Sequence, residues 1–215
     1  MDNSRQGVTR HNDFIRRHGD WVWYYPSAKC PCESSVERPL ITCPYCKGTG
    51  ILHLERQEIR GIMADIKMDK QLLNSGIASP GDMAFSQEIG RIELTEWDML
   101  KMQVPQPYEG QLVTRGAGLA DTLWYDIGEV QHCLYIDPIA KDLTEYTRDV
   151  DFTAEGKVVS WLGDNRPAQG KRYSIKYTAY FEWIVFLPPT LRVERGTNLG
   201  QRVVLRKRHI ALGTQ

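Results

Sequence analysis

Four cysteines near the amino end constrain this chain of 215 residues more than any other feature. Cys30 and Cys32 form a CxC pair, and Cys43 and Cys46 form a CxxC pair after ten intervening residues. Two close pairs on facing turns can supply four thiolates to one tetrahedral zinc ion. A catalytic zinc normally keeps one position open for water, whereas four cysteines close the coordination shell. The spacing therefore predicts a structural zinc knuckle with these four ligands.

The residues beside the cysteines suit tight turns. Pro31 and Pro44 each follow the first cysteine of a pair, where proline stiffens the backbone. Gly48 and Gly50 follow the second pair, where a turn back into extended chain requires a positive φ. Two disulfides or four unrelated buried thiols are the alternative interpretations. A CxC pair can hardly bridge to itself without strain, and no signal peptide suggests secretion.

Charge and hydrophobicity exclude some classes of partner. The chain carries 27 basic and 27 acidic residues, so its overall field predicts neither a nucleic-acid nor a membrane partner. No apolar run approaches the length of a membrane span. The fifth cysteine, Cys133, lies in a predicted strand and is interpreted as a small buried side chain. His53 is interpreted as an ordinary histidine, because the four cysteines already complete a ligand set.

Short alternating segments separated by turn residues predict a mostly β protein. We expect a β-barrel or sandwich with an N-terminal four-cysteine zinc knuckle and few short helices. A hairpin is predicted over residues 152–161 around Glu155 and Gly156, and a long extended run over residues 171–187. The aromatic run 21–25 is expected to cover the metal loop, because such a loop has little core of its own.

Helical signals are confined to two places. Asn12 is predicted to cap a short helix that ends at Gly19, after a polar arm over residues 1–10. Thr95 is predicted to cap one helical turn, with Asp98 three residues later as a variant of the capping box.

Four regions follow from these signals. We predict an arm and short helix over residues 1–25, the zinc knuckle over 26–55, a β-rich core domain over 56–190, and basic strands or an arm over 191–215. The last region is locally basic, through Arg192, Arg195, Arg202, Arg206, Lys207 and Arg208. Basic side chains usually protect a solvated strand edge, and contact with nucleic acid or with an acidic partner surface is the alternative interpretation.

Motifs that would indicate an enzyme do not occur. The sequence has no GxSxG, HExxH, Walker or Rossmann pattern. The five histidines, at positions 11, 18, 53, 132 and 209, are scattered. We therefore predict that the chain is not an enzyme.

Two resemblances to known families add to this interpretation. The segment CPYCKGTG, which contains Cys43 and Cys46, resembles one repeat of the cysteine-rich domain of DnaJ-type co-chaperones. Those domains carry four such repeats, whereas this chain has one and lacks the J domain with its HPD motif. This likeness implies the same kind of zinc-binding turn, and it implies no chaperone function.

The second resemblance is broader. The segment from Phe152 to Tyr177, with Trp161 and Tyr173 at matching positions, resembles a hairpin that recurs in neck, tail and baseplate proteins of tailed bacteriophages. The aromatic N-terminal run followed by the two cysteine pairs is similar to small zinc-bearing phage virion proteins.

The phage resemblance implies a structural role without catalysis. The chain would be a structural component of a phage particle, located in the virion after assembly in the host cytoplasm. As a neck or head–tail connector protein it would form a cyclic homo-oligomer and join neighbouring neck or tail proteins. A tail or baseplate adaptor is the alternative within this class. A zinc-dependent nucleic-acid-binding module is the alternative from another class, and a salt titration of binding would distinguish it.

Overall fold

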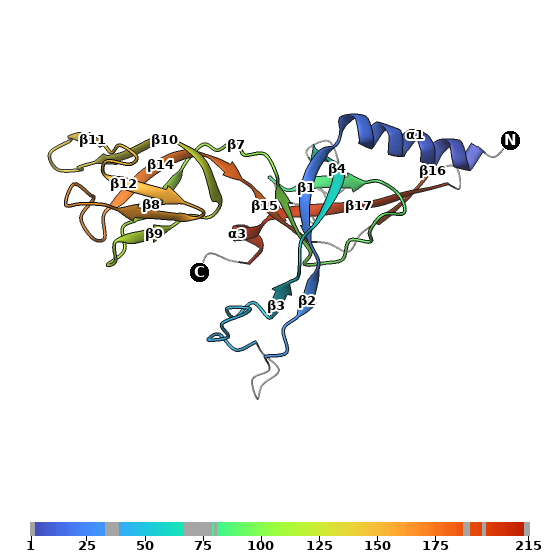
Figure 1. Cartoon of the computed structure of the whole chain (residues 1–215), viewed down its shortest axis with the longest axis horizontal. Coiled ribbons are helices and arrows are strands. Elements are labelled where there is room, and N and C mark those ends of the chain that lie inside the picture. The colour runs from blue at the N-terminus through green and yellow to red at the C-terminus, as the bar shows by residue number, and fades with distance from the viewer. Residues whose placement is uncertain are drawn as a thin grey trace. The chain divides into compact units, whose positions relative to one another are not determined.

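The computed structural model describes residues 3–32, 39–66, 79, 81–186, 190–194 and 197–212. The chain divides into two compact units, of which unit 1 comprises Met1–Gln103 and Glu182–Gln215 and unit 2 comprises Val104–Phe181. It is mostly β, as predicted, and the described helices are α1 (Asn3–His18) and α3 (Arg208–Ala211) (Figure 1). Unit 2 is thus an insertion into the chain of unit 1.

Unit 1 is built on a closed barrel. Six strands follow one another in the order β15-β6-β1-β4-β5-β17, and β15 also pairs with β17, so the ring closes. Closure leaves each barrel strand with a neighbour on both sides over part of its length. The strands of unit 1 are β1 (Asp20–Tyr25), β2 (Ser27–Lys29), β3 (Ile51–His53), β4 (Gln57–Asp65), β5 (Met83–Gln87), β6 (Met99–Met102), β15 (Glu182–Val185), β16 (Thr190–Glu194) and β17 (Thr197–Lys207).

Alternating side chains explain why the aromatic run 21–25 lies in the barrel. Val22 and Tyr24 are buried, whereas Trp21 lies on the outer surface. The prediction that this run covers the metal loop was wrong, because strand β1 pairs with β4 and β6 and contributes to the barrel core. Fully buried aliphatic and aromatic residues from the other strands complete this core, namely Phe85, Leu100, Ile184, Val203 and Leu205.

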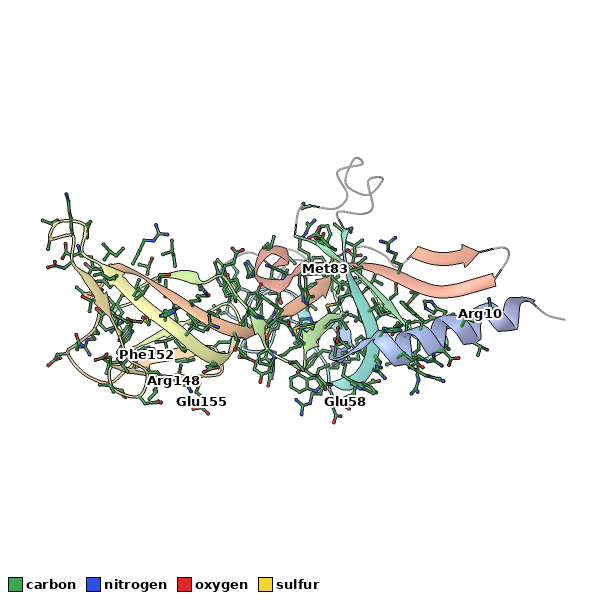
Figure 2. The ribbon with its side chains drawn as sticks, turned by 90° about the horizontal axis from the view of Figure 1, so that it is seen from above. Arg10, Glu58, Met83, Arg148, Phe152 and Glu155 are labelled. Atoms are coloured by element: carbon green, nitrogen blue, oxygen red, sulfur yellow. The ribbon has the colours of Figure 1, made fainter. Side chains whose placement is uncertain are left out.

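Helix α1 replaces the arm and short helix that the sequence predicted. It already includes residues 3–10, and Asn12 lies inside it rather than at its start. The Asn12 Oδ1 atom accepts a hydrogen bond from the backbone N–H of Ile89 at 2.9 Å, so this side chain ties the helix to the segment after β5 instead of capping the helix. Ile15 is fully buried, and three basic residues in the last turn complement the helix dipole. Figure 2 shows Arg10 on this helix.

The helix ends at His18, and Gly19, the next residue, lies close to strand β4. The Gly19 N–H donates to the carbonyl of Ile15 at 2.7 Å, which closes the last turn. A Cβ atom at Gly19 would lie 2.9 Å from the carbonyl oxygen of Gly61, and one at Gly61 would lie 2.2 Å from Phe85 Cζ. Gly19 is therefore required for the close approach of α1 to strand β4, and Gly61 is required for the packing of the Phe85 ring against β4.

Unit 2 consists of two sheets around one core. Its strands are β7 (Gln106–Pro107), β8 (Gln111–Thr114), β9 (Ala120–Thr122), β10 (Asp126–Ile136), β11 (Leu143–Glu145), β12 (Phe152–Glu155), β13 (Val158–Trp161) and β14 (Arg172–Tyr180). Strands β11, β10, β14, β7 and β8 form one sheet, and β12, β13 and β9 form the other. The core includes Phe152, Trp161 and Tyr173, and the Trp161 and Tyr173 rings meet edge to face at 5.2 Å.

Of the two extended segments predicted over residues 152–187, the hairpin agrees with the structure and the long run does not. Strands β12 and β13 pair from Phe152 opposite Trp161 to Glu155 opposite Val158, and Gly156 in the turn has φ 55°. The hairpin prediction is therefore confirmed. The long run over residues 171–187 is two strands instead, β14 and β15, which belong to different units and are separated at Phe181.

The units also differ from the predicted regions. The predicted core domain over residues 56–190 contains all of unit 2 together with strands β4, β5, β6 and β15 of the barrel. The region 191–215, predicted as basic strands or an arm, does contain a strand, β17, which pairs with both β5 and β15 and closes the ring. Strands from both ends of the chain build the barrel, and local turn signals carry no information about such long-range pairing.

Candidate metal centre

The four predicted ligands come together at the tip of a two-stranded ribbon. Strands β2 and β3 are antiparallel, and their last pair is Lys29 opposite Ile51. The Cys30 N–H then donates to the Gly50 carbonyl at 2.8 Å, which extends the pairing one step further. Figure 1 shows the ribbon as the continuation of β1 and β4 beyond the barrel. The chain order thus presents both cysteine pairs at the end of one hairpin.

Positive backbone angles shape the turn after the second pair. The N–H of Lys47 donates to the carbonyl of Cys43 at 2.9 Å. Lys47, Gly48 and Gly50 have φ values of 51°, 84° and 74°, so the prediction for the two glycines is confirmed. A Cβ atom on Gly50 would lie 2.8 Å from Pro39 Cγ, which adds a steric reason for glycine.

The sulfur atoms have the spacing of a four-ligand site. Cys30 Sγ lies 3.8 Å from Cys43 Sγ, and Cys32 Sγ lies 3.3 Å from Cys46 Sγ. All four sulfurs lie within 4.8 Å of one another. A tetrahedral ion with metal–sulfur bonds of about 2.3 Å requires sulfur–sulfur edges of about 3.8 Å. All four cysteines are free thiols, so the predicted ligands are brought together as a candidate metal site and not as disulfides.

Backbone and thiol hydrogen bonds shift the pKa values of Cys32 and Cys43 in opposite directions. A backbone hydrogen bond from Cys46, opposed by burial and supported by another from Tyr45, lowers the pKa of Cys43 to about 6. Hydrogen bonds with the thiols of Cys46 and then Cys30 raise the pKa of Cys32 to about 12. Because metals bind the thiolate, Cys43 is ready to act as a ligand at neutral pH.

A buried carboxylate fastens the ribbon to the barrel. Asp98 is 1% exposed, and its Oδ1 accepts the backbone N–H of Ser27, the first residue of β2, at 2.7 Å. Its Oδ2 accepts the Tyr24 hydroxyl at 3.0 Å and the Thr95 N–H at 2.7 Å. Burial and then the Asp98 charge raise the pKa of Tyr24, which keeps this hydroxyl protonated as a donor. One side chain therefore joins β1, β2 and the segment before β6.

The prediction of a helical turn at residues 95–100 was wrong. Asp98 does reach back to the N–H of Thr95, as in a capping arrangement, but Trp97 has φ 74° and strand β6 begins at Met99. Met99 pairs with β1 on one side and β15 on the other, and these two ladders override the local helix signal. Sequence reasoning found the Thr95–Asp98 contact and missed its role as an anchor of the ribbon.

Two other candidate residues lie elsewhere. His53 Nε2 is 3.1 Å from the carbonyl oxygen of Trp97, so this histidine is satisfied there, and burial lowers its pKa. Cys133 is buried in the core of unit 2, where burial raises the pKa of its thiol to about 12. Over the part of the chain that the structure describes, the one group of metal-ligand type is the four-cysteine cluster.

Comparison with protein-family models finds no match, and comparison with curated proteins finds no significant similarity. Within the described ranges, neither helix has the length and apolar character needed to cross a bilayer.

Proposed function

We propose that this chain is a structural component of a tailed-phage particle, a neck or head–tail connector protein that assembles into a ring. The observation that supports this most is a projecting ribbon whose tip is shaped by four cysteines and whose base is tied to a closed barrel through Asp98. Such an element keeps its shape without turnover, which is what a joint between subunits requires.

The metal in this proposal is a structural zinc ion. Four sulfur donors at tetrahedral spacing suit zinc or iron, and zinc is the commoner ion in closed four-cysteine knuckles. The four thiolates complete its shell, so the ion fixes the loop rather than binding a substrate. Elemental analysis of the purified protein distinguishes the two metals, and an iron content of one per chain would contradict the zinc assignment.

Exposed apolar side chains favour a role in contacts with other proteins. At the ribbon tip, Ile41 is 84% exposed and Tyr45 is 81% exposed. In unit 2, Ile136, Ile139 and Leu143 are exposed around the connection from β10 to β11, where Asp137 Oδ1 accepts the N–H of Ile139 at 2.8 Å. Large apolar residues that gather at fixed tips mark contact surfaces.

The basic C-terminal segment gives less support to nucleic-acid binding. Arg206 donates to both carboxylate oxygens of buried Asp82, at 3.0 and 2.8 Å, and Arg208 donates to buried Glu182 at 2.8 Å. Arg206 also lies over the Phe186 ring at 3.5 Å. These cations have partners inside unit 1, so we place nucleic-acid binding second to assembly. The side chains of Arg192 and Arg195 lie outside the described residues.

Native mass spectrometry of the full chain at rising concentration, combined with negative-stain electron microscopy, tests the proposal. We expect closed rings of one stoichiometry with one metal ion per chain. A monomer at every concentration would contradict the ring. In the phage that encodes the chain, particles that lack it should show separate heads and tails; joined particles without a baseplate would favour the adaptor instead.

A further inference from the structure

Strand β4 has an open edge in the wall of the barrel. Its pairing with β5 ends where Gly61 lies opposite Gln87. Residues 57–60 of β4 continue beside β1 on one side. On their other side no strand of the described chain pairs with them, because β5 ends at Gln87 and the chain makes a turn at residues 89–91. This stretch of four residues spans about 13 Å of strand.

A cavity of about 290 Å³ lies along this edge. Its wall consists of Trp21, residues 57–60 of β4, Gln87, Glu88, Arg91 and Ile92. Gln87 is 3% exposed, and its Nε2 donates to the carbonyl of Ile92. The Oε1 atom of the same amide is buried and has no hydrogen-bond partner within the described residues. A buried acceptor without a donor costs free energy, so the cavity is prepared for a ligand that brings an N–H group.

The far wall of the cavity is held in place by helix α1. Asn12 Oδ1 accepts the N–H of Ile89 at 2.9 Å, and Arg16 Nε lies 3.2 Å from Glu88 Oε2. His11 Nε2 lies 3.3 Å from the Gln87 carbonyl oxygen. These contacts come from two consecutive turns of one helix. They hold residues 87–89 in place where the chain leaves β5, so these residues do not fill the gap beside residues 57–60 of β4.

The charges at the cavity favour a neutral ligand. Two acidic residues, Glu58 and Glu88, are balanced by two basic ones, Arg60 and Arg91. The backbone of an extended peptide is neutral and alternates N–H donors with carbonyl acceptors. It can therefore pair with an open strand edge and place one N–H against the buried acceptor of Gln87.

Strand β16 of the chain also has an edge that pairs with no described strand. β16 (Thr190–Glu194) is the last strand of the sheet order, and among described strands it pairs with β17 alone. Within the described ranges no strand pairs with its other edge, and an edge of this kind is the usual template for addition to another sheet. It has five residues, enough to cover the four of the open edge of β4.

We propose that strand β16 of a second copy adds to the open edge of β4, alongside residues 57–60, and donates a backbone N–H to Gln87 Oε1. The two edges are different surfaces of the same chain, so each copy offers one and receives the other. Contacts of this head-to-tail kind close into rings when the rotation permits. The inference thus rests on the proposed function, and it names the interface that builds the ring.

Site-specific photo-crosslinking tests the contact. The crosslinking amino acid p-benzoylphenylalanine replaces Glu58, whose exposed side chain points outward from β4 (Figure 2). Equal amounts of ¹⁵N-labelled and unlabelled full-length protein are mixed, assembled and irradiated. We expect crosslinks between copies that map to residues 190–194. The matched control carries the same group at Glu155, an exposed position in unit 2, and should give no crosslink to these residues.

Hydrogen exchange of the same full-length protein gives a second readout. On assembly, the backbone amides of residues 57–60 that face the open edge should exchange at least about tenfold more slowly. Those of residues 61–65, whose edge on that side of β4 is already paired with β5, should change little.

The outcomes separate this inference from the proposed function. Rings whose Glu58 crosslinks map away from residues 190–194 would overturn the strand addition and leave the ring assembly standing. Crosslinks to 190–194 in open chains without rings would support the strand addition and contradict the connector. Monomers alone, with no crosslinks between copies, would overturn both.

Discussion

The ribbon of unit 1 and the core of unit 2 reach a fixed shape by different means. Among the described residues of the ribbon, from 26 to 54, the buried side chains are those of Cys43 and Cys46. Unit 2 instead encloses a cluster of aromatic and aliphatic residues in which Trp161 contacts Tyr146, Phe152 and Tyr173. The ribbon has a four-cysteine cluster in place of a core and would be fixed by the proposed ion, whereas unit 2 depends on its own apolar core.

Removal of one ligand should have the largest effect. In Cys43→Ser, the metal should be lost and the ribbon should unfold locally, because coordination contributes about 10 kcal/mol or more in four-cysteine sites. Elemental analysis and hydrogen exchange of residues 27–29 and 51–53 would measure this. Cys133→Ser is the matched control and should keep the full metal content. Equal metal loss in both variants would contradict the assignment of ligands.

Truncation of a core side chain in unit 2 should lower the stability of unit 2 and leave the metal content unchanged. Phe152 is fully buried, so Phe152→Ala should destabilise unit 2 by about 3–5 kcal/mol while the metal content stays unchanged. Denaturant unfolding followed by tryptophan fluorescence would show this loss. Val158→Ala, at a partly exposed position on β13, should cost less than about 1 kcal/mol. Metal release in Phe152→Ala would mean that the two regions are coupled.

The anchor of the ribbon should give an intermediate effect. Asp98→Ala leaves the Ser27 N–H, the Thr95 N–H and the Tyr24 hydroxyl without their acceptor, which should cost about 3 kcal/mol. We expect faster hydrogen exchange at the base of the ribbon and an occupied metal site at its tip. The exposed neighbour Glu96→Ala should change stability by less than about 0.5 kcal/mol. Loss of metal in Asp98→Ala would show that the tip needs the anchor.

Proton release on metal binding should give the smallest change. The pKa of Cys43 is lowered to about 6, below the ordinary thiol value of about 8.5. Above pH 6 this thiol is already ionised, so binding releases no proton from it; below pH 6 it must lose one. Titration calorimetry in buffers of different ionisation enthalpy should therefore find about one more proton released per metal at pH 5 than at pH 7. The same number at both values would contradict the lowered pKa.

Features set by neighbouring residues could be predicted from the sequence. The cysteine spacing located the sulfur cluster, Gly48 and Gly50 have the required positive φ, and Gly156 lies in the predicted hairpin. In each case the physical cause lies within a few residues, in ligand geometry or in the absence of a Cβ atom.

Features set by residues that are distant in the sequence could not be predicted from it. The barrel closes through the pairing of β15 with β17, in which Trp183 lies opposite Lys207. Strand β6 pairs with β15 although all of unit 2 lies between these two strands in the sequence. The roles of Asn12 and Asp98 depend on partners on other elements, Ile89 for the first and Ser27 for the second. Both were interpreted as local helix caps because the same side-chain oxygens that cap helices also accept distant N–H groups.

The insertion point of unit 2 makes the chain modular. The two connections leave from β6 and β15, where Lys101 lies directly opposite Glu182, so the chain departs from and returns to adjacent positions. A tight turn of two residues is enough to link such positions in an antiparallel pair. A shortened chain with that turn would keep all six barrel strands in their order. The inserted unit is therefore separable along the chain from the barrel and its four-cysteine ribbon.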